Sequence, residues 1–253
     1  YVEIINIMEF KKLIEPINLQ DFMHKFNNAE TFVIKGSKNK FLDLISLEEI
    51  ENVVNNGCNF STPLEIIQDG GRKFYVEKNI PWTQFASNKT IIKKFLEKNH
   101  SFLMRNQSQI NPKVAALITS IENTFDFAAD LHLYVSPVTS GSGYDAHRDR
   151  PQHKIYLQVI GRTNWTIFSY KKDLPENVGA IKSFDEKKYL NELMTIELKP
   201  GDLLYMPPDT FHKVRNHNEP RISFSIPFNK VDQKFKKMDR THIPFKQIFE
   251  SNL

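Results

Sequence analysis

Residues 140–149 of this chain read SGSGYDAHRD, and residues 206–214 read MPPDTFHKV. The first stretch places His147 and Asp149 two positions apart. In a β-strand, residues i and i+2 point to the same face, so an imidazole and a carboxylate can reach one ion together. His212 lies in the second stretch, and we expect it to come from a later strand as the third ligand. The two stretches therefore predict a metal site on a scaffold of strands.

Two imidazoles and one carboxylate on one side of a metal leave its other side open to small ligands. This donor set is typical of non-heme Fe(II) oxygenases. A His-x-Asp pattern is weak by itself. The stretch at residues 199–208, which reads KPGDLLYMPP, adds a turn, a strand and a rigid approach that would bring His212 to the mouth of a barrel.

The composition indicates one packed domain, which we expect to cover residues 1–253. Hydrophobic residues make up 40% of the chain and aromatic residues 12%, so a sizeable core can be filled. Phe is common, with 20 residues, whereas Gly is sparse, with 9. This balance favours a packed interior over a disordered chain.

Charge, cysteine content and hydropathy point to a cytoplasmic protein. No apolar run approaches the length of a membrane span, and the N-terminus lacks a secretory-signal pattern, so we expect no membrane partner. The single cysteine, Cys58, cannot form a disulfide within the chain, which fits a reducing compartment. The net charge of +4 is mild, so we do not expect nucleic-acid binding. A homodimer is kept as an alternative to a monomer. One basic cluster is interpreted as a solvated helix face, or else as a docking patch for an acidic protein or RNA: Lys234, Lys236, Lys237 and Arg240.

The first 128 residues are expected to be mainly helical, with short strands. Apolar residues recur at helical spacing from residue 9 to residue 26, although Pro16 must interrupt that helix. Ser46 and Glu49 form a capping-box pattern that begins a short helix, and Pro112 suits the first turn of another. Further expected elements are a strand at 31–34, a hairpin of strands at 64–68 and 73–76, and a helix around 91–96.

From about Ala129 the pattern changes to short strands separated by Pro, Gly and polar turns. The expected strands cover residues 130–136, 154–160, 164–168, 194–198, 203–206 and 221–226. Between them, only residues 186–193 favour a helix. Such a run of strands is typical of a sandwich or barrel, so we expect a β-core over residues 129–228 and a C-terminal extension over residues 229–253.

Several stretches together resemble one family. They are LYVSP at 133–137, the His147-Arg148-Asp149 triplet, LQVIG at 157–161, Trp165, the KPGD turn at 199–202, and His212. This set is similar to the Jumonji-C-like cupin hydroxylases, in particular their ribosomal oxygenase branch, over about residues 130–228. The resemblance implies an α+β fold, in which a double-stranded β-helix (a cupin or jelly-roll barrel) follows a mainly helical N-terminal region.

The resemblance also implies Fe(II) as the metal, 2-oxoglutarate and O2 as co-substrates, and hydroxylation as the reaction. The two histidines and the aspartate named above then hold the metal, and no further catalytic residue is assigned. Family members usually carry Lys or Arg two residues after the glycine that matches Gly161, whereas this chain has Thr163. We therefore expect Arg221 to bind the distal carboxylate of 2-oxoglutarate, because Arg221 and Ser223 resemble the Arg-x-Ser anchor of other 2-oxoglutarate oxygenases.

Arg162 and Lys154 are the alternatives to Arg221 as the carboxylate anchor. Trp165 is expected to lie in the core. Three polar residues are expected to line the co-substrate pocket, by strand parity and by the resemblance: Tyr134, Gln158 and Thr163. Three histidines near the motif are not assigned to the site: His132, His153 and His217.

Our leading hypothesis is an Fe(II)- and 2-oxoglutarate-dependent hydroxylase that acts on a side chain of a protein or peptide. The alternatives are a hydroxylase of a free amino acid or other small molecule, a metal-dependent isomerase or dioxygenase that does not use 2-oxoglutarate, and a non-catalytic metal-binding or sugar-binding cupin. The carboxylate anchor distinguishes these classes. No phosphate-binding glycine loop and no Ser-His-Asp nucleophile elbow appears in the sequence.

Overall fold

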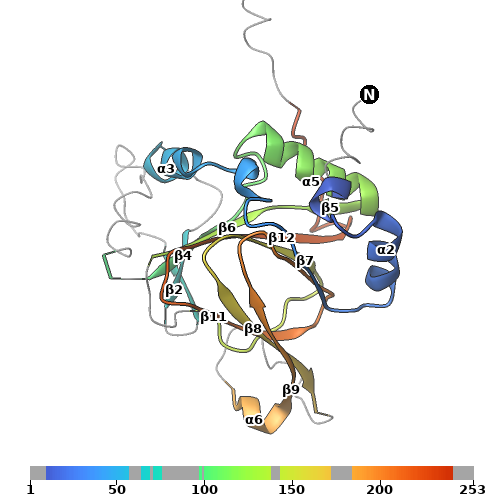
Figure 1. Cartoon of the computed structure of the whole chain (residues 1–253), viewed down its shortest axis with the longest axis vertical. Coiled ribbons are helices and arrows are strands. Elements are labelled where there is room, and N and C mark those ends of the chain that lie inside the picture. The colour runs from blue at the N-terminus through green and yellow to red at the C-terminus, as the bar shows by residue number, and fades with distance from the viewer. Residues whose placement is uncertain are drawn as a thin grey trace, which may run out of the picture.

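Two antiparallel sheets and a layer of helices form the α+β fold of the computed structural model (Figure 1). The structure describes residues 10–56, 64–68, 71–75, 97–98, 100–137, 143–171 and 184–241. The helices are α2 (Leu19–Asn27), α3 (Leu47–Asn56), α5 (Pro112–Phe125) and the short α6 (Glu186–Tyr189), with a 3-10 helix at Leu42–Leu44. Among the helices in these ranges, none is both long and apolar enough to cross a membrane.

The larger sheet has the order β1-β10-β7-β12-β6-β4-β2-β3, and β5 pairs with β12. Its strands are β1 (Phe32–Ile34), β2 (Leu64–Gln68), β3 (Gly71–Tyr75), β4 (Ser101–Met104), β5 (Phe127–Ala129), β6 (His132–Ser136), β7 (His153–Ile160), β10 (Leu203–Met206) and β12 (Arg221–Lys230). The smaller sheet has the order β11-β8-β9. Its strands are β8 (Thr163–Tyr170), β9 (Leu190–Leu198) and β11 (Phe211–Asn216).

The helical elements of the N-terminal part begin where the sequence predicts. The first helical residues end before Pro16, and α2 begins after the N-cap Asn18. The capping box before α3 is complete, because the Ser46 N–H donates to Glu49 Oε2 at 2.7 Å and the Glu49 N–H donates to Ser46 Oγ at 3.0 Å. Pro112 begins α5. The hairpin of β2 and β3 is confirmed, whereas the helix expected around residues 91–96 lies outside the described residues.

The expected strands of the second half are confirmed as β6, β7, β8, β9, β10 and β12. The expectation that His212 comes from a later strand is also confirmed, because residues 211–216 form β11, although no bounds were predicted for that strand. One expectation was wrong. The helix expected at 186–193 ends at Tyr189, because residues from Leu190 onward pair with β8 instead.

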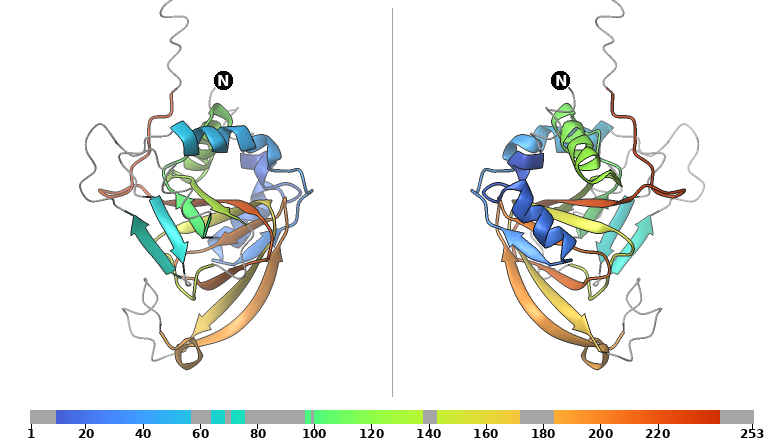
Figure 2. Two further views of the ribbon diagram at one scale, coloured as in Figure 1. Left: turned by 90° about the vertical axis from the view of Figure 1, so that its left-hand side faces the viewer. Right: turned by 90° about the vertical axis from the view of Figure 1, so that its right-hand side faces the viewer.

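The larger sheet lies between the helices and the smaller sheet (Figure 2). Its two faces carry different kinds of side chain. On β12, Ile222, Phe224 and Ile226 join the core that packs under α2, α3 and α5. Their neighbours Arg221 and Ser223 are also buried but belong to the opposite face of the strand. That face is turned toward the smaller sheet, and a second apolar cluster fills part of the space between the sheets. Polar side chains are therefore concentrated between the two sheets.

The C-terminal extension differs from expectation, because residues 231–241 contain no helix. Part of the basic cluster instead fastens this segment to α5. Arg240 and Glu122 form an ion pair at 2.7 Å in which both side chains are almost fully buried, and Lys237 pairs with Asp126 at 2.7 Å. Two of the four cations of the cluster therefore have structural partners.

His153, the first residue of β7, lies in an aromatic cluster beneath α2. Its ring stacks on Phe26 with centroids 4.7 Å apart, and its Nδ1 is 2.8 Å from the Tyr205 hydroxyl. Burial lowers the pKa of His153 from 6.5 to about 4. The folded protein therefore favours the neutral imidazole of His153, whereas the same imidazole binds a proton more readily in the unfolded chain.

We predict that the free energy of unfolding falls as the pH drops from about 6.5 to about 4, by less than about 3 kcal/mol from this residue, because solvent screens the partly buried imidazole. The sign follows because the unfolded state binds more protons in that window. In the variant His153→Phe, the fall should be smaller. Urea unfolding followed by tryptophan fluorescence at several pH values measures it, with the exposed His24→Gln as control. An unchanged pH dependence in His153→Phe would contradict the assignment.

Candidate metal centre

His212 is the second residue of β11, and its side chain points between the sheets. The strand is held along its length by antiparallel pairing with β8. The imidazole is 2% exposed, and its Nδ1 lies 2.9 Å from the carbonyl oxygen of Thr210. Trp165 of β8 stacks on the imidazole with ring centroids 5.6 Å apart, and this confirms Trp165 as a core residue. The Thr210 carbonyl and the Trp165 ring therefore fix the orientation of the His212 imidazole.

His147 and Asp149 do not lie on a regular strand, which corrects the sequence analysis. Only His147 pairs with another strand, in an isolated antiparallel bridge to His212. The His147 N–H donates to the His212 carbonyl at 3.0 Å, and the His212 N–H donates to the His147 carbonyl at 2.8 Å. Single backbone hydrogen bonds flank the bridge, because the Val214 N–H donates to the Tyr144 carbonyl at 3.0 Å and the Asp209 N–H donates to the Asp149 carbonyl at 2.9 Å. These backbone contacts together bring the two histidines next to each other.

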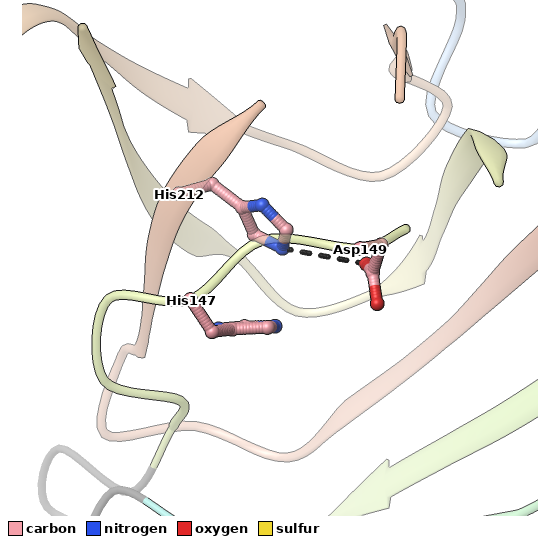
Figure 3. Close-up of side chains that lie close together, drawn as sticks. All are labelled: His147, Asp149 and His212. Carbon is pink, nitrogen blue, oxygen red and sulfur yellow. Dashed lines mark ion pairs between the residues drawn. The ribbon is translucent and has the colours of Figure 1, made fainter. Parts of the chain in front are cut away.

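The three predicted metal ligands converge between the sheets (Figure 3). One potential donor atom from each of His147, Asp149 and His212 lies within 4.8 Å of the other two. The pair His212 Nε2 and Asp149 Oδ2 is 3.9 Å apart, and the two imidazole rings have centroids 4.2 Å apart. These separations are short enough for one ion to contact all three side chains.

Hydrogen bonds select the imidazole tautomers that a metal requires. His147 Nδ1 lies 2.7 Å from the carbonyl oxygen of Asp145, just as His212 Nδ1 faces the carbonyl of Thr210. A carbonyl oxygen only accepts, so Nδ1 carries the proton in both rings. The Nε2 lone pair is then available on each neutral imidazole. The donor set of two imidazole nitrogens and one carboxylate therefore suits a divalent transition metal.

Burial keeps the His212 imidazole and the Tyr156 phenol uncharged near pH 7. Desolvation, followed by the nearby His147, lowers the pKa of His212 to about 3, so its imidazole is neutral near pH 7. Asp149 Oδ2 lies 3.7 Å from Lys154 Nζ and 3.4 Å from the Tyr156 hydroxyl, which donates to it. Burial and the Asp149 charge raise the pKa of Tyr156, so this phenol stays protonated.

Asp209 connects the two segments that carry the ligands. Its carboxylate accepts from Arg148 Nη1 at 3.0 Å and from Arg150 Nη2 at 2.8 Å, and Arg150 Nε also donates to it. The Asp209 N–H donates to the Asp149 carbonyl at 2.9 Å. The Arg150 hydrogen bond, with the charges of both arginines, lowers the pKa of Asp209. The backbone of Asp209 has φ of 66°, a left-handed conformation that Asp and Asn tolerate.

A cavity of about 240 Å³ adjoins the three ligands. Its other lining residues are mostly polar and come from both sheets: Arg105, His132, Tyr134, Tyr144, Arg150, Gln152, Lys154, Tyr156, Trp165, Val214 and Arg221. His132, which the sequence analysis did not assign to the site, is therefore part of the cavity wall. A volume below about 300 Å³ suits a small co-substrate better than a drug-sized ligand.

Arg221 is a buried cation in this cavity, with 4% of its surface exposed. Its Nη1 donates to Asn216 Oδ1 at 2.7 Å, and its Nε and Nη2 donate to Ser223 Oγ at 3.0 and 2.7 Å. Both acceptors are neutral, and among the described residues no carboxylate forms an ion pair with Arg221. Desolvation lowers its pKa to about 10, which leaves it charged near pH 7. A buried guanidinium with neutral partners is suited to receive an anionic ligand.

The remaining predicted residues separate into two groups. Tyr134 lines the cavity and lies under the Arg221 guanidinium, 5.4 Å from ring centroid to carbon, and Lys154 also lines it. Thr163 and Gln158 are not among the lining residues. The Thr163 hydroxyl donates to Gln158 Oε1 at 3.0 Å and accepts from the Trp165 indole at 2.9 Å.

Arg162 lies outside the cavity. Its side chain is exposed and pairs with Glu219 at 2.9 Å. This position agrees with strand parity, since Thr163 and Trp165 point inward and their neighbours point outward. Of the three cations considered for the carboxylate anchor, Arg221 and Lys154 line the cavity and Arg162 does not.

The sequence analysis missed Asp209, Tyr156 and Asn216. Asn216 lies four residues after His212, so a correct prediction of β11 would have put both on one face. The same parity argument applies to Tyr156, two residues after Lys154 on β7. No local pattern would have linked Asp209 to Arg148 and Arg150, because that contact depends on how two loops meet.

Comparison with known proteins places these residues in a known type of domain. A model of the JmjC domain matches residues 103–234, which include the proposed ligands and Arg221. The bifunctional lysine-specific demethylase and histidyl-hydroxylase NO66 of Drosophila persimilis is 24% identical over 208 residues, which are 80% of this chain and 28% of that protein. Ribosomal oxygenase 2 of Rattus norvegicus is 23% identical over 209 residues, 81% of this chain and 43% of that protein. The chain thus spans less than half the length of these curated relatives.

The solved structures that resemble this fold include YcfD, a ribosomal oxygenase from Escherichia coli. In its complex with cobalt and 2-oxoglutarate, YcfD matches this chain with a TM-score of 0.58 and 22% sequence identity. The match covers 87% of this chain and 53% of the YcfD chain. At this identity the likeness shows that the two proteins share a fold.

The Asp209 contacts predict a test of the metal centre. The variant Asp209→Asn keeps a residue that tolerates the left-handed backbone but loses the charge that holds Arg148 and Arg150. We expect Co(II) affinity to fall by roughly 10-fold, because groups that orient the ligands typically contribute 10- to 100-fold. Isothermal titration with Co(II) measures this change. Asp232→Asn, at an exposed carboxylate in the C-terminal extension, is the control, and equal affinities in all three proteins would refute the role of Asp209.

Proposed function

Because this chain belongs to the JmjC domain family, we propose that it is an Fe(II)- and 2-oxoglutarate-dependent oxygenase that hydroxylates a side chain of a protein or peptide. Family membership agrees with the resemblance found in the sequence. The observation that carries the proposal is one cavity that holds both a two-histidine, one-carboxylate donor set and the buried guanidinium of Arg221. A metal-binding protein that does not use 2-oxoglutarate would not need a buried guanidinium beside its metal ligands.

His147, Asp149 and His212 would hold the iron. The two Nε2 atoms and the carboxylate supply three ligands, a number that leaves further coordination positions for co-substrates. With 2-oxoglutarate and O2, such an iron centre supplies the oxidising power that converts a C–H bond to C–OH, while 2-oxoglutarate is decarboxylated to succinate. The protein's own part is to fix the ligand orientations through backbone carbonyls and the Asp209 contacts, and to exclude water with Trp165.

Arg221 would bind the distal carboxylate of 2-oxoglutarate. Charge-assisted hydrogen bonds from a guanidinium are among the strongest available to a carboxylate, and burial strengthens them further. Tyr134 lies against the guanidinium and would limit its movement. We assign Thr163 an indirect role, because its hydroxyl holds the indole of Trp165.

We further propose that the two sheets form a double-stranded β-helix within a single JmjC-like domain covering residues 1–253. The antiparallel order of both sheets and the likeness to YcfD support this arrangement. A protein or peptide substrate is supported by the names of the relatives, which include a histidyl-hydroxylase and a ribosomal oxygenase. Hydroxylation of a small molecule is the alternative that a substrate screen distinguishes. The cytoplasmic location and a homodimer stay predictions.

Removal of any metal ligand should abolish 2-oxoglutarate turnover. We expect His147→Ala, Asp149→Ala and His212→Ala each to lower succinate formation by more than about 100-fold. This loss is larger than the roughly 10- to 100-fold loss that is typical when a residue that only orients a metal ligand is removed. The substrate is unidentified, so succinate is measured in the uncoupled reaction with Fe(II), 2-oxoglutarate and O2, and circular dichroism checks the fold. Full activity in a folded variant would remove that residue from the metal site.

Loss of the Arg221 guanidinium should weaken 2-oxoglutarate binding without weakening metal binding. For Arg221→Ala we expect a roughly 10- to 100-fold higher Kd for 2-oxoglutarate, since a hydrogen bond to a charged group contributes about 1.5–3 kcal/mol. Asn216→Ala should raise it less, because Asn216 only holds the guanidinium in place. Anaerobic titration in the presence of Mn(II) measures both, with the exposed Arg162→Ala as control. A larger effect in Arg162→Ala than in Arg221→Ala would overturn the assignment.

A further inference from the structure

A second and larger cavity lies in the helical layer, away from the metal. This groove has a volume of about 950 Å³ and shares no lining residue with the metal cavity. Most residues of the segments 12–16 and 35–44 line it, together with residues of the first turns of α5. Figures 1 and 2 show where these segments lie. These elements pack on the face of the larger sheet that is turned away from the smaller sheet. A molecule bound here would not obstruct the metal site.

The groove has an apolar floor and a polar rim. Leu13, Phe41 and Leu117 line it and are at most 5% exposed, so they belong to the core beneath it. Leu44 and Ala116 also line the groove, and both side chains are partly exposed. An apolar centre surrounded by polar residues is the usual organisation of a surface that binds another protein.

Lysines dominate the charge of the rim, and two of them donate to neutral groups. The Lys40 ammonium donates to the carbonyl oxygen of Glu15, and the Lys113 ammonium donates to the carbonyl oxygen of Asp43 at 3.0 Å. Neither carbonyl carries a charge that compensates the cation. Lys40 is partly buried, and desolvation lowers its pKa even though Glu15 acts in the opposite direction. An anionic group placed beside Lys40 would compensate for the hydration that this ammonium loses on burial.

The other charged residues of the rim restrict which class of ligand can bind in the groove. Lys35 is already paired with Asp202 at 2.8 Å, and Lys12 is exposed. The side chains of Glu15 and Asp43 also line the groove and would repel a ligand with uniform negative charge. Among the residues lining the groove the only aromatic ring is the buried Phe41, so no exposed ring is available to stack on nucleic-acid bases.

We propose that this groove, lined by Lys12, Lys40 and Lys113 above an apolar floor, docks an acidic amphipathic peptide segment of a partner protein. Carboxylates of the segment lie beside the three ammonium groups, and its apolar side chains contact the partly exposed Leu44 and Ala116. The charge pattern and the apolar floor together favour this occupant over RNA. Because the groove is separate from the metal cavity, the proposal does not depend on the proposed oxygenase activity.

Fluorescence anisotropy tests the proposal with the full chain. The probes are fluorescein-labelled peptides of alternating Glu-Leu and alternating Lys-Leu, and fluorescein-labelled oligouridylate. We expect saturable binding of the Glu-Leu peptide, weakened by salt, and weaker or no binding of the other two. The double variant Lys12→Glu/Lys113→Glu should lower the affinity by about 10-fold, because two favourable exposed charge pairs become repulsive.

Both substituted lysines are exposed, so the double variant should keep its fold and its succinate formation. Lys187→Glu, on the distant α6, is the matched control and should bind the Glu-Leu peptide as the unmodified protein does. Equal binding of both peptides, or no loss in the double variant, would overturn the proposal. Competition by oligouridylate for the same lysines would identify the groove as a nucleic-acid site instead.

Discussion

The antiparallel backbone bridge between His147 and His212 is the contact on which the rest of the site depends. Two N–H to carbonyl hydrogen bonds join a loop that follows β6 to the second residue of β11. This pairing sets the distance between the imidazoles, and it aligns the next loop residues so that Asp149 reaches the same point. Two further backbone hydrogen bonds flank the bridge, from the Val214 N–H to the Tyr144 carbonyl at 3.0 Å and from the Asp209 N–H to the Asp149 carbonyl at 2.9 Å. The Asp209 carboxylate also holds Arg148 and Arg150 beside the ligands.

Strand parity then decides what surrounds the metal. On β7 and β12, the residues that face the helices are mostly apolar, and the alternate residues face the smaller sheet. A lysine, a tyrosine and an arginine are therefore buried in one small cavity, where low polarity strengthens their interactions with anions. Arg221 reaches this cavity from β12, whereas Thr163 of β8 is buried against Gln158 and Trp165. The carboxylate anchor that we propose therefore belongs to β12.

Much of this arrangement could be predicted from residue patterns, and the failures have physical causes. Alternating apolar residues identified the central strands, and local capping chemistry located α3 and α5. His147 and Asp149 lie beside His212 as the sequence predicts, but they do not share a strand: a bridge joins His147 to His212, and the Asp149 carbonyl accepts from the Asp209 N–H. The partners of Arg221 and Asp209 depend on contacts between segments far apart in the chain, and a local pattern contains no information about them. The groove in the helical layer was not foreseen for the same reason.

The most direct test of this account is a crystal structure of the full chain grown anaerobically with Fe(II) and 2-oxoglutarate. The account predicts iron bound by Nε2 of His147, Nε2 of His212 and the carboxylate of Asp149, with the distal carboxylate of 2-oxoglutarate on Arg221. Iron bound elsewhere, or iron bound at this triad while 2-oxoglutarate lies away from the cavity, would contradict it.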